Sequence, residues 1–230
     1  MNNKIKIAIA GATGFTGLEL IHLLTKHHKV EIKNLISSSN AGKSIKIFDK
    51  RIKKKLPKLQ SLKTVNWLNV DILFLALPNG EAQKIIKQLY NYKHLKFIDL
   101  SADFRLTNPI NFKQWYQISH RAKELIKDSL YSIPELDKDK IDNFRIISNP
   151  GCYPTSVQIP LIPLINNSED AKNVVNSCKY PPIGKRGLFS TSRTGKYGIT
   201  PIIDHVKTSN DEMFISVQIE TLDGIENQDS

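Results

Sequence analysis

The stretch "AIAGATGFTGLEL", residues 8–20, decides the fold, because three glycines at a spacing of three follow an apolar run. Residues 4–10 alternate and then become continuously apolar, which predicts a strand that enters the middle of a sheet. Apolar side chains then recur at helical spacing over 15–27, and 30–37 has the composition of a second strand. The glycines therefore lie where a strand turns into a helix within a β-α-β unit.

A helix that begins at such glycines suits a phosphate ligand. Its first turn offers unpaired N–H groups and a partial positive charge, and glycine lets a pyrophosphate approach the backbone closely. The spacing differs by one residue from the usual dinucleotide fingerprint, and a simple tight turn is the alternative. The cofactor contacts that we expect in this loop are Gly11, Thr13, Gly14, Phe15, Thr16 and Gly17.

The same strand-and-helix pattern continues along the chain. Residues 71–78 and 95–100 predict two more strands, with a helix over 81–90 between them. Residues 144–152 predict a further strand that runs into a turn, and two prolines should shorten the helix that follows. The expected fold class is α/β, with a Rossmann-type, mostly parallel sheet.

The last third of the chain gives weaker signals. Residues 179–198 are rich in Pro, Gly, Ser and Lys and are interpreted as a loop. Residues 213–219 alternate in the manner of a late strand, and the acidic end of the chain is expected to fray.

The composition favours an ordinary cytoplasmic protein. The net charge is +11 with a basic run at 50–58, but Lys, Asn and Ile are abundant throughout, so we attribute the charge to a chain-wide bias. We expect no nucleic-acid partner, although a salt-dependent nucleic-acid-binding protein stays an alternative. No stretch approaches the roughly 18 apolar residues of a membrane span, and the start is polar too early for a signal peptide. We also expect no metal.

The end of the second strand distinguishes between the two nicotinamide cofactors. An acid that would read the ribose of NAD is absent there. Residues 37–44 instead supply hydroxyls and Lys43, which suits a 2′-phosphate, so we expect NADP(H), although a plain polar loop is the alternative. The expected contacts outside the glycine loop are Ser37, Ser38 and Pro78.

Cys152 is the candidate nucleophile. It follows "SNPG" at the end of a predicted strand and stands just before a predicted helix, with Pro154 suited to the first turn. A helix N-terminus favours the thiolate, which can attack an activated acyl group and hold it for hydride transfer. A small cysteine of the core is the alternative.

Seven motifs now resemble one enzyme family in order and spacing. They are "GATGFTGLEL", "NAGK", "LALPNG", "DLSADFRL", "WYQISH", "YSIPELDKDKI" and "SNPGCYPTS". Over about residues 4–160 the chain resembles the N-acetyl-gamma-glutamyl-phosphate reductases of arginine biosynthesis.

The resemblance implies an NADP-binding Rossmann domain at 1–150 and a shortened α+β substrate domain at 151–230, of the semialdehyde-dehydrogenase type. It implies that Cys152 attacks the acyl phosphate of N-acetyl-L-glutamyl 5-phosphate, that phosphate leaves, and that NADPH reduces the thioester to the semialdehyde. Arg105 and Asn149 are expected to bind substrate, and this scaffold commonly self-associates. The alternative for Arg105 is an ion pair with a carboxylate such as Asp103.

The chain also departs from the family pattern. Ser38 stands where an arginine is common, and Asn79 stands where a histidine is common. Beyond about residue 165 the family's histidine-containing acid/base motif is missing. His205 is only a weak candidate for the base, and Cys178 has no expected role.

Other functions therefore stay open. Aspartate-semialdehyde dehydrogenase shares the scaffold and the thiol chemistry. A diverged or truncated chain that binds NADP without turnover, or that works with a partner, is the non-enzyme alternative.

Overall fold

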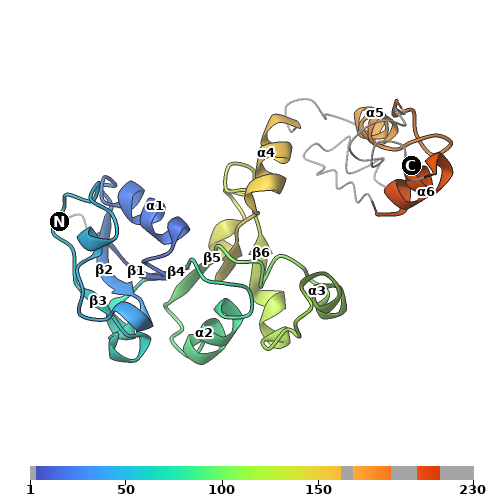
Figure 1. Cartoon of the computed structure of the whole chain (residues 1–230). Coiled ribbons are helices and arrows are strands. Elements are labelled where there is room, and N and C mark those ends of the chain that lie inside the picture. The colour runs from blue at the N-terminus through green and yellow to red at the C-terminus, as the bar shows by residue number, and fades with distance from the viewer. Residues whose placement is uncertain (1–3, 162–167, 188–200, 213–230) are drawn as a thin grey trace. The chain divides into compact units, whose positions relative to one another are not determined.

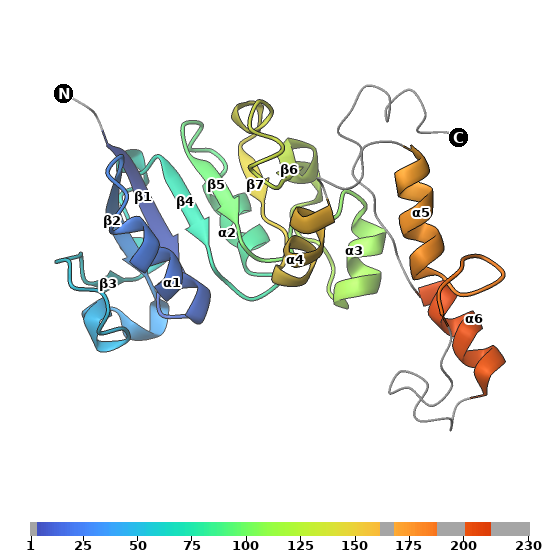
Figure 2. The ribbon, with the colours of Figure 1, turned by 90° about the horizontal axis from the view of Figure 1, so that it is seen from above.

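The computed structural model describes residues 4–161, 168–187 and 201–212. The chain divides into two compact units, residues 1–155 and 156–230 (Figure 1). The first unit contains a seven-stranded sheet in which every pair of neighbouring strands is parallel, in the order β3-β2-β1-β4-β5-β7-β6 (Figure 2). The expected Rossmann-type sheet is therefore confirmed.

The strands that the apolar runs predicted are present but shorter than expected, because the ladder of backbone hydrogen bonds ends where the chain turns at the sheet edge. The strands of the first unit are β1 (Ile5–Ala10), β2 (Val30–Ile36), β3 (Leu59–Gln60), β4 (Ile72–Leu75), β5 (Lys96–Asp99), β6 (Ser129–Tyr131) and β7 (Ile146–Ser148). The helices that begin within it are α1 (Phe15–Leu24), α2 (Ala82–Leu89), α3 (Pro109–Tyr116) and α4 (Cys152–Leu161).

Helices cover both faces of the sheet, as Figure 1 shows for α1 and α2. Alternate residues of β4 face opposite sides, so that Leu73 and Leu75 pack in the cluster of α2 while Ile72 and Phe74 pack against the cluster of α1. Helix α2 contributes Ala82, Ile86 and Leu89 at helical spacing. The result is a rigid core that holds the loops at the carboxyl ends of the strands.

Two strands and one α-helix of this unit were not predicted. Strands β3 and β6 have two and three residues and so carry no recognisable alternation. Helix α3 begins at Pro109 and is capped by Asn108, whose side chain accepts a hydrogen bond of 2.8 Å from the backbone N of Ile110. An Asn-Pro pair before a helix is a readable start signal, so α3 was predictable in principle.

The described part of the second unit includes two helices that were not predicted. It contains α5 (Ser168–Cys178) and α6 (Ile202–Glu212), and the buried side chain of Asn210 accepts from the backbone N of Tyr180 at 2.8 Å. Residues 179–187 have no helix or strand, as expected, whereas the predicted strand at 213–219 lies outside the described residues.

Within residues 4–161, 168–187 and 201–212, none of the helices combines the length and the apolar composition that a membrane crossing requires.

Candidate active site

The loops at the carboxyl edge of the parallel sheet hold almost all of the predicted site residues. In a sheet of this kind ligands bind beyond the carboxyl ends of the strands, where the strand order reverses. The order changes direction between β1 and β4, so the loops that follow these two strands face each other across that point. The glycine loop follows β1 and the Leu-Pro-Asn-Gly turn follows β4.

Two of the three glycines are required by the protein itself. Gly11 has a φ of +77°, and a Cβ there would lie 2.0 Å from the carbonyl oxygen of Ala76. A Cβ at Gly17 would lie 2.2 Å from the carbonyl oxygen of Gly11. These contacts let the loop pass close to β4 and let α1 pack against the loop.

Gly14 has a different reason to lack a side chain. A Cβ there would meet only the carbonyl oxygen of Gly11, at the ordinary contact distance of 3.4 Å, so the protein leaves room at this position. Gly14 is the N-cap of α1, which has no side-chain cap and no acid in its first turn. The space and the uncapped helix end fit a bound phosphate.

The loop after β2 joins the glycine loop through hydroxyls. The Oγ1 of Thr13 lies 3.2 Å from the Oγ of Ser37, which also accepts from the amide of Asn40 at 3.4 Å. The ammonium of Lys43 donates to Asn40 Oδ1 at 3.0 Å. Ser38 is exposed at the start of the next short turn. The loop thus presents hydroxyls and one cation beside the glycines.

The turn after β4 and the loop after β5 are bonded to each other. Asp103 is fully buried and accepts hydrogen bonds from the backbone N of Gly80 at 2.6 Å and of Gln83 at 3.0 Å. Asn79 Oδ1 accepts from the backbone N of Ala102 at 3.2 Å. Pro78 is exposed within this turn. Sequence reasoning missed this role of Asp103, although its position in "SADFR" lies two residues before Arg105.

The loop after β5 is also shaped by a second buried carboxylate. Asp99 accepts from the backbone N and the hydroxyl of Ser101 at 2.9 and 2.7 Å, and from the backbone N of Phe104 at 3.3 Å. Burial raises the pKa of Asp99 to about 6, although the bonds from Ser101 oppose that shift. The carboxyl group thus holds the first residues of this loop against the end of β5.

Arg105 lies against the residue before the candidate nucleophile. Its Nε donates to the carbonyl oxygen of Asn149 at 2.9 Å, and a Cβ on Gly151 would lie 3.0 Å from its Nη1. Among the described residues Arg105 makes no ion pair, and the carboxylate of Asp103 accepts from backbone N–H groups instead. The ion pair weighed as the alternative is therefore wrong.

Cys152 is exposed at the first position of α4, and the first helical bond runs from the backbone N of Thr155 to the carbonyl oxygen of Gly151 at 3.0 Å. Asn149, which precedes it, donates its backbone N to the carbonyl oxygen of Asp99 at 2.8 Å. The sequence prediction of a thiol at a strand-to-helix turn agrees with this placement.

Tyr131 is a neighbour of Arg105 that sequence reasoning did not find. It ends β6, in register with Ser148 of β7. Burial raises the pKa of its phenol, the charge of Arg105 opposes that shift, and the phenol of Tyr116 adds to it. A three-residue strand gave no signal from which this placement was predictable.

His205, the weak candidate for the base, lies in the second unit. Its ring is 5.6 Å from the ring of Tyr180, and its Nδ1 lies 3.4 Å from the hydroxyl of Ser209. These contacts explain the side chain as part of the packing between α6 and the segment that follows α5. Cys178 is the last residue of α5 and is half-buried.

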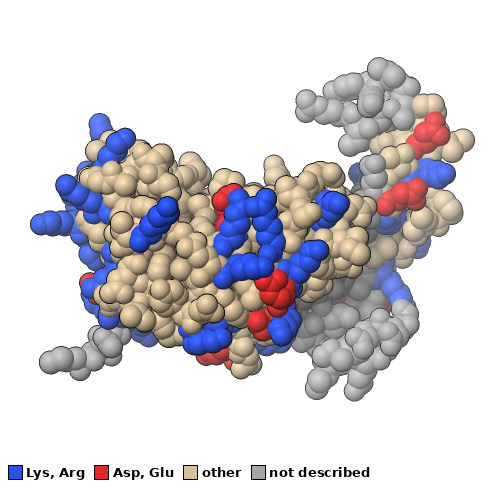
Figure 3. All heavy atoms as spheres, turned by 90° about the horizontal axis from the view of Figure 1, so that it is seen from below, with Lys and Arg blue, Asp and Glu red and all other residues tan. Residues whose placement is uncertain are grey.

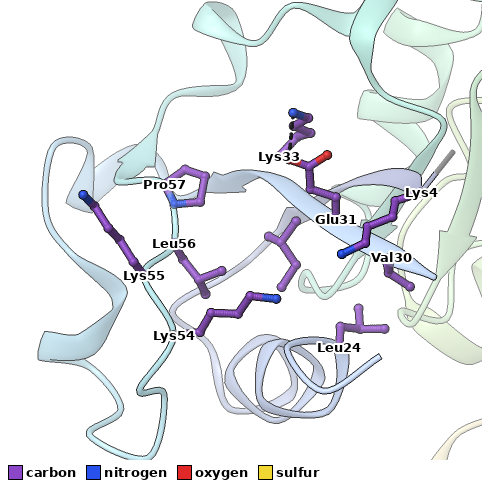
Figure 4. Close-up of a pocket in the computed structure, with 10 residues that line it drawn as sticks. Lys4, Leu24, Val30, Glu31, Lys33, Lys54, Lys55, Leu56 and Pro57 are labelled. Atoms are coloured by element: carbon purple, nitrogen blue, oxygen red, sulfur yellow. Dashed lines mark ion pairs between the residues drawn. The ribbon is translucent and has the colours of Figure 1, made fainter. Parts of the chain in front are cut away.

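A groove of about 560 Å³ lies at the opposite, amino edge of the sheet (Figure 4). Four lysines and several apolar side chains line it, and none of the predicted site residues does. Lys33 pairs with Glu31 at 2.8 Å, and the ammonium of Lys54 lies 3.4 Å from the carbonyl oxygen of Thr25. Two of its cations thus have acceptors within the protein, and the groove is separate from the candidate active site.

Surface charge is dispersed in the view of Figure 3, where Lys and Arg project singly or in small groups with acidic side chains between some of them. Several lysines have acidic partners, including Lys84 with Glu81 and Lys87 with Glu124. Exposed pairs of this kind add little stability.

Comparisons with known proteins show the family of the chain and its fold. Residues 6–144 match the family model described as "Semialdehyde dehydrogenase, NAD binding domain". A protein of Oryza sativa subsp. japonica, named "Probable N-acetyl-gamma-glutamyl-phosphate reductase, chloroplastic", is 43% identical over 163 residues, which cover 70% of this chain and 39% of that protein. A protein of Arabidopsis thaliana with the same name is 37% identical over 206 residues, covering 85% of this chain and 51% of that protein.

The extent of these matches adds two facts. The 206 residues matched in the Arabidopsis protein exceed the span 4–160 in which motifs were recognised, so similarity extends beyond it. The chain spans about half the length of its curated relatives, from 39% to 55%.

A solved structure shows the same fold. Aspartate semialdehyde dehydrogenase II of Vibrio cholerae, complexed with ASA, superposes with a TM-score of 0.52 at 22% identity, covering 70% of this chain and 46% of that chain.

Proposed function

The chain belongs to the semialdehyde dehydrogenase family through its NAD-binding domain, and from this premise we propose that it is an NADPH-dependent N-acetyl-gamma-glutamyl-phosphate reductase. The observation that carries the proposal is the placement of Arg105 against Gly151, directly before the exposed Cys152. A nucleophilic sulfur and a fixed guanidinium are what an acyl phosphate requires.

The chain's own residues would perform the acyl-transfer half of the reaction. The sulfur of Cys152 attacks the acyl carbon of N-acetyl-L-glutamyl 5-phosphate, a C–S bond forms, and the C–O bond to phosphate breaks. Backbone N–H groups at the start of α4 would donate to a developing oxyanion. Arg105 binds an anionic group of the substrate, because its side chain is already held by backbone carbonyl oxygens. Asn149 fixes the side chain of Arg105 through its backbone carbonyl oxygen.

The cofactor site fits a dinucleotide on two observations. A Cβ at Gly14 would meet no close contact, and the first turn of α1 carries no acid. The backbone of residues 11–17 would hold the pyrophosphate, with Thr13, Phe15 and Thr16 beside it and Pro78 across from it. When bound, the reduced cofactor supplies the hydride that converts the thioester to the aldehyde.

The preference for NADP over NAD rests on the loop after β2. The hydroxyls of Ser37 and Ser38 and the ammonium of Lys43 offer donors to a 2′-phosphate, and the link from Thr13 to Ser37 ties them to the glycine loop. Substitution of Lys43→Gln should weaken NADP binding and leave NAD binding unchanged, whereas an equal loss for both would contradict this assignment.

The test is the reverse reaction with the purified chain. N-acetylglutamate 5-semialdehyde, phosphate and NADP are combined and NADPH is followed by absorbance, with Cys152→Ser alongside and Cys178→Ser as the matched control. The proposal predicts phosphate-dependent turnover that Cys152→Ser abolishes and Cys178→Ser retains. No turnover by a folded chain that binds NADP would overturn it and favour a binding protein.

Three further expectations belong to this proposal. When the acetylglutamyl and aspartyl acyl phosphates compete, the chain should turn over the acetylglutamyl substrate faster. Faster turnover of the aspartyl substrate would favour an aspartate-semialdehyde dehydrogenase. A cytoplasmic location and self-association are expected from the family resemblance, and sedimentation of the chain tests the second.

A further inference from the structure

The N-terminus of α2 is capped by a residue from another loop. Glu81, at the N-cap position, makes no capping hydrogen bond, and the first turn contains no acid. The carboxylate of Asp103 takes this place and accepts from the backbone N of Gly80 at 2.6 Å and of Gln83 at 3.0 Å. Asp103 has 0% exposure, so its charge is compensated inside the protein by these donors and by the helix end.

The two loops are bonded in both directions. Besides the two bonds that Asp103 accepts, the side chain of Asn79 accepts from the backbone N of Ala102 at 3.2 Å. Gly80 has a φ of +89°, and a Cβ there would lie 3.1 Å from the Cδ1 of Ile118, so the turn has little freedom to take another shape. A shift of the turn after β4 must therefore move the loop after β5.

Each loop carries a residue predicted to touch a different ligand. The turn after β4 contains Pro78, one of the expected cofactor contacts, and the loop after β5 contains Arg105 only two residues beyond Asp103. The guanidinium of Arg105 is held by the carbonyl oxygens of Asn149 and Leu100, at 2.9 and 3.5 Å. A displacement of one loop is thus passed to the other through the buried carboxylate of Asp103, together with the side chain of Asn79.

We propose that Asp103 is a positioning residue that couples the cofactor turn to the anion site at Arg105, so that NADP and an anionic group of the substrate strengthen each other's binding. The identity of the two ligands rests on the proposed function. The first ligand to bind sets the position of both loops, because they are bonded to each other, and the second ligand then binds to a loop that is already in place. Because coupling is reciprocal, each ligand tightens the other by the same factor.

The experiment measures this factor without turnover. The dissociation constant of NADP is determined by calorimetry on the full chain, with and without saturating inorganic phosphate as the anion probe, for the original chain and for Asp103→Asn. Asparagine keeps the size but turns an acceptor into a donor that faces a backbone N–H. Asp137→Asn is the matched control, because Asp137 is also buried but pairs with Lys140, away from both loops.

We expect phosphate to lower the dissociation constant of NADP about fivefold or more in the original chain and in Asp137→Asn. In Asp103→Asn the factor should fall close to one, while each ligand alone still binds. Asn79→Ala removes the hydrogen bond from the backbone N of Ala102 to the exposed Asn79 side chain, and should reduce the coupling factor by a smaller amount. This variant tests the inference if Asp103→Asn does not fold.

Two outcomes would overturn the inference: no effect of phosphate on NADP binding in the original chain, or unchanged coupling in the folded variants. The proposed function fails separately, through the absence of phosphate-dependent turnover. A chain with coupling but no turnover would keep this inference and lose that function.

Discussion

The carboxyl and amino edges of the sheet both carry charged side chains, but they hold them differently. At the carboxyl edge Arg105, Asp99 and Asp103 are fixed by backbone carbonyl or N–H groups, and the charged groups of both aspartates are buried. At the amino edge the lysines line an open groove, where Lys33 pairs with a solvated Glu31. Fixed charge is what binding and chemistry require, since no ordering cost is left for the moment of reaction. The lesson is that a hollow lined by charge is a weaker indication of an active site than charge held by the backbone.

The largest effect on stability is expected for Gly11 in the glycine loop of the carboxyl edge, where the backbone leaves no room for a side chain. Gly11→Ala combines a φ of +77° with a Cβ placed 2.0 Å from the carbonyl oxygen of Ala76, so the loop must move. We expect a loss of about 3 kcal/mol or more in the free energy of unfolding. Urea unfolding followed by circular dichroism measures it. A loss below about 1 kcal/mol would show that the loop is not held as described.

Substitution of Arg105→Lys should affect substrate binding next most strongly. Lysine keeps the charge but lacks the planar fork that bonds the carbonyl oxygen of Asn149. In the reverse reaction the KM for phosphate should rise about 10–100-fold, the range expected for a lost charged hydrogen bond, while kcat changes less. Lys4→Gln at the amino-edge groove is the control and should leave KM unchanged. An equal rise of the KM for phosphate in both variants would contradict the proposed difference between the two edges.

Gly14→Ala is expected to separate binding from stability. The protein leaves room for a Cβ at this position, with the nearest atom at 3.4 Å, so the free energy of unfolding should change by less than about 1 kcal/mol. The dissociation constant of NADP should rise about tenfold, because the methyl group would occupy the space against the helix end. Calorimetry measures the second quantity. Unchanged NADP affinity would mean that the cofactor does not approach Gly14.

The smallest effect concerns pH. Because burial raises the pKa of Asp99 to about 6, above its ordinary value, the folded chain binds this proton more tightly than the unfolded chain. Asp99 therefore stabilises the fold increasingly as pH falls below about 6, and that contribution is lost as pH rises through about 6. Between about pH 8 and pH 5 the difference is about 1 kcal/mol.

The contribution of Asp99 is measured as the difference in unfolding free energy between the original chain and Asp99→Asn. Burial lowers the pKa of His120, so this residue destabilises the fold as pH falls and opposes the effect of Asp99. Subtracting the unfolding free energy of Asp99→Asn from that of the original chain at each pH removes the contribution of His120. A flat difference over this pH range would contradict the assignment.

Features with a local cause were predictable from the sequence. The glycines of the first loop mark positions where backbone lies against backbone, and the apolar run of β4 marks a strand that is covered on both faces. Cys152 was recognisable because a strand, a turn and a helix start follow each other there within a few residues. Each of these signals is contained in a short, continuous piece of sequence.

Features with a tertiary cause were not predictable. The sequence does not distinguish a solvated aspartate from a buried one. Asp103 is buried beneath the start of a helix that lies about twenty residues earlier in the chain. Tyr131 comes near Arg105 only because β6 pairs with β7, and a strand of three residues leaves no pattern. The predicted departures at Ser38 and Asn79 fall on loops, and the bond of Asn79 to Ala102 became visible only in the fold.

The most direct test of the central claim, that the carboxyl edge is an acylating active site, omits phosphate. The chain is mixed with N-acetylglutamate 5-semialdehyde and NADP, and both NADPH formation and the mass of the Cys152 peptide are measured. The account predicts a burst of one NADPH per chain and an N-acetylglutamyl group on Cys152, which added phosphate then releases. A folded, NADP-binding chain that gives no burst, or that carries the acyl group on Cys178 instead, would contradict it.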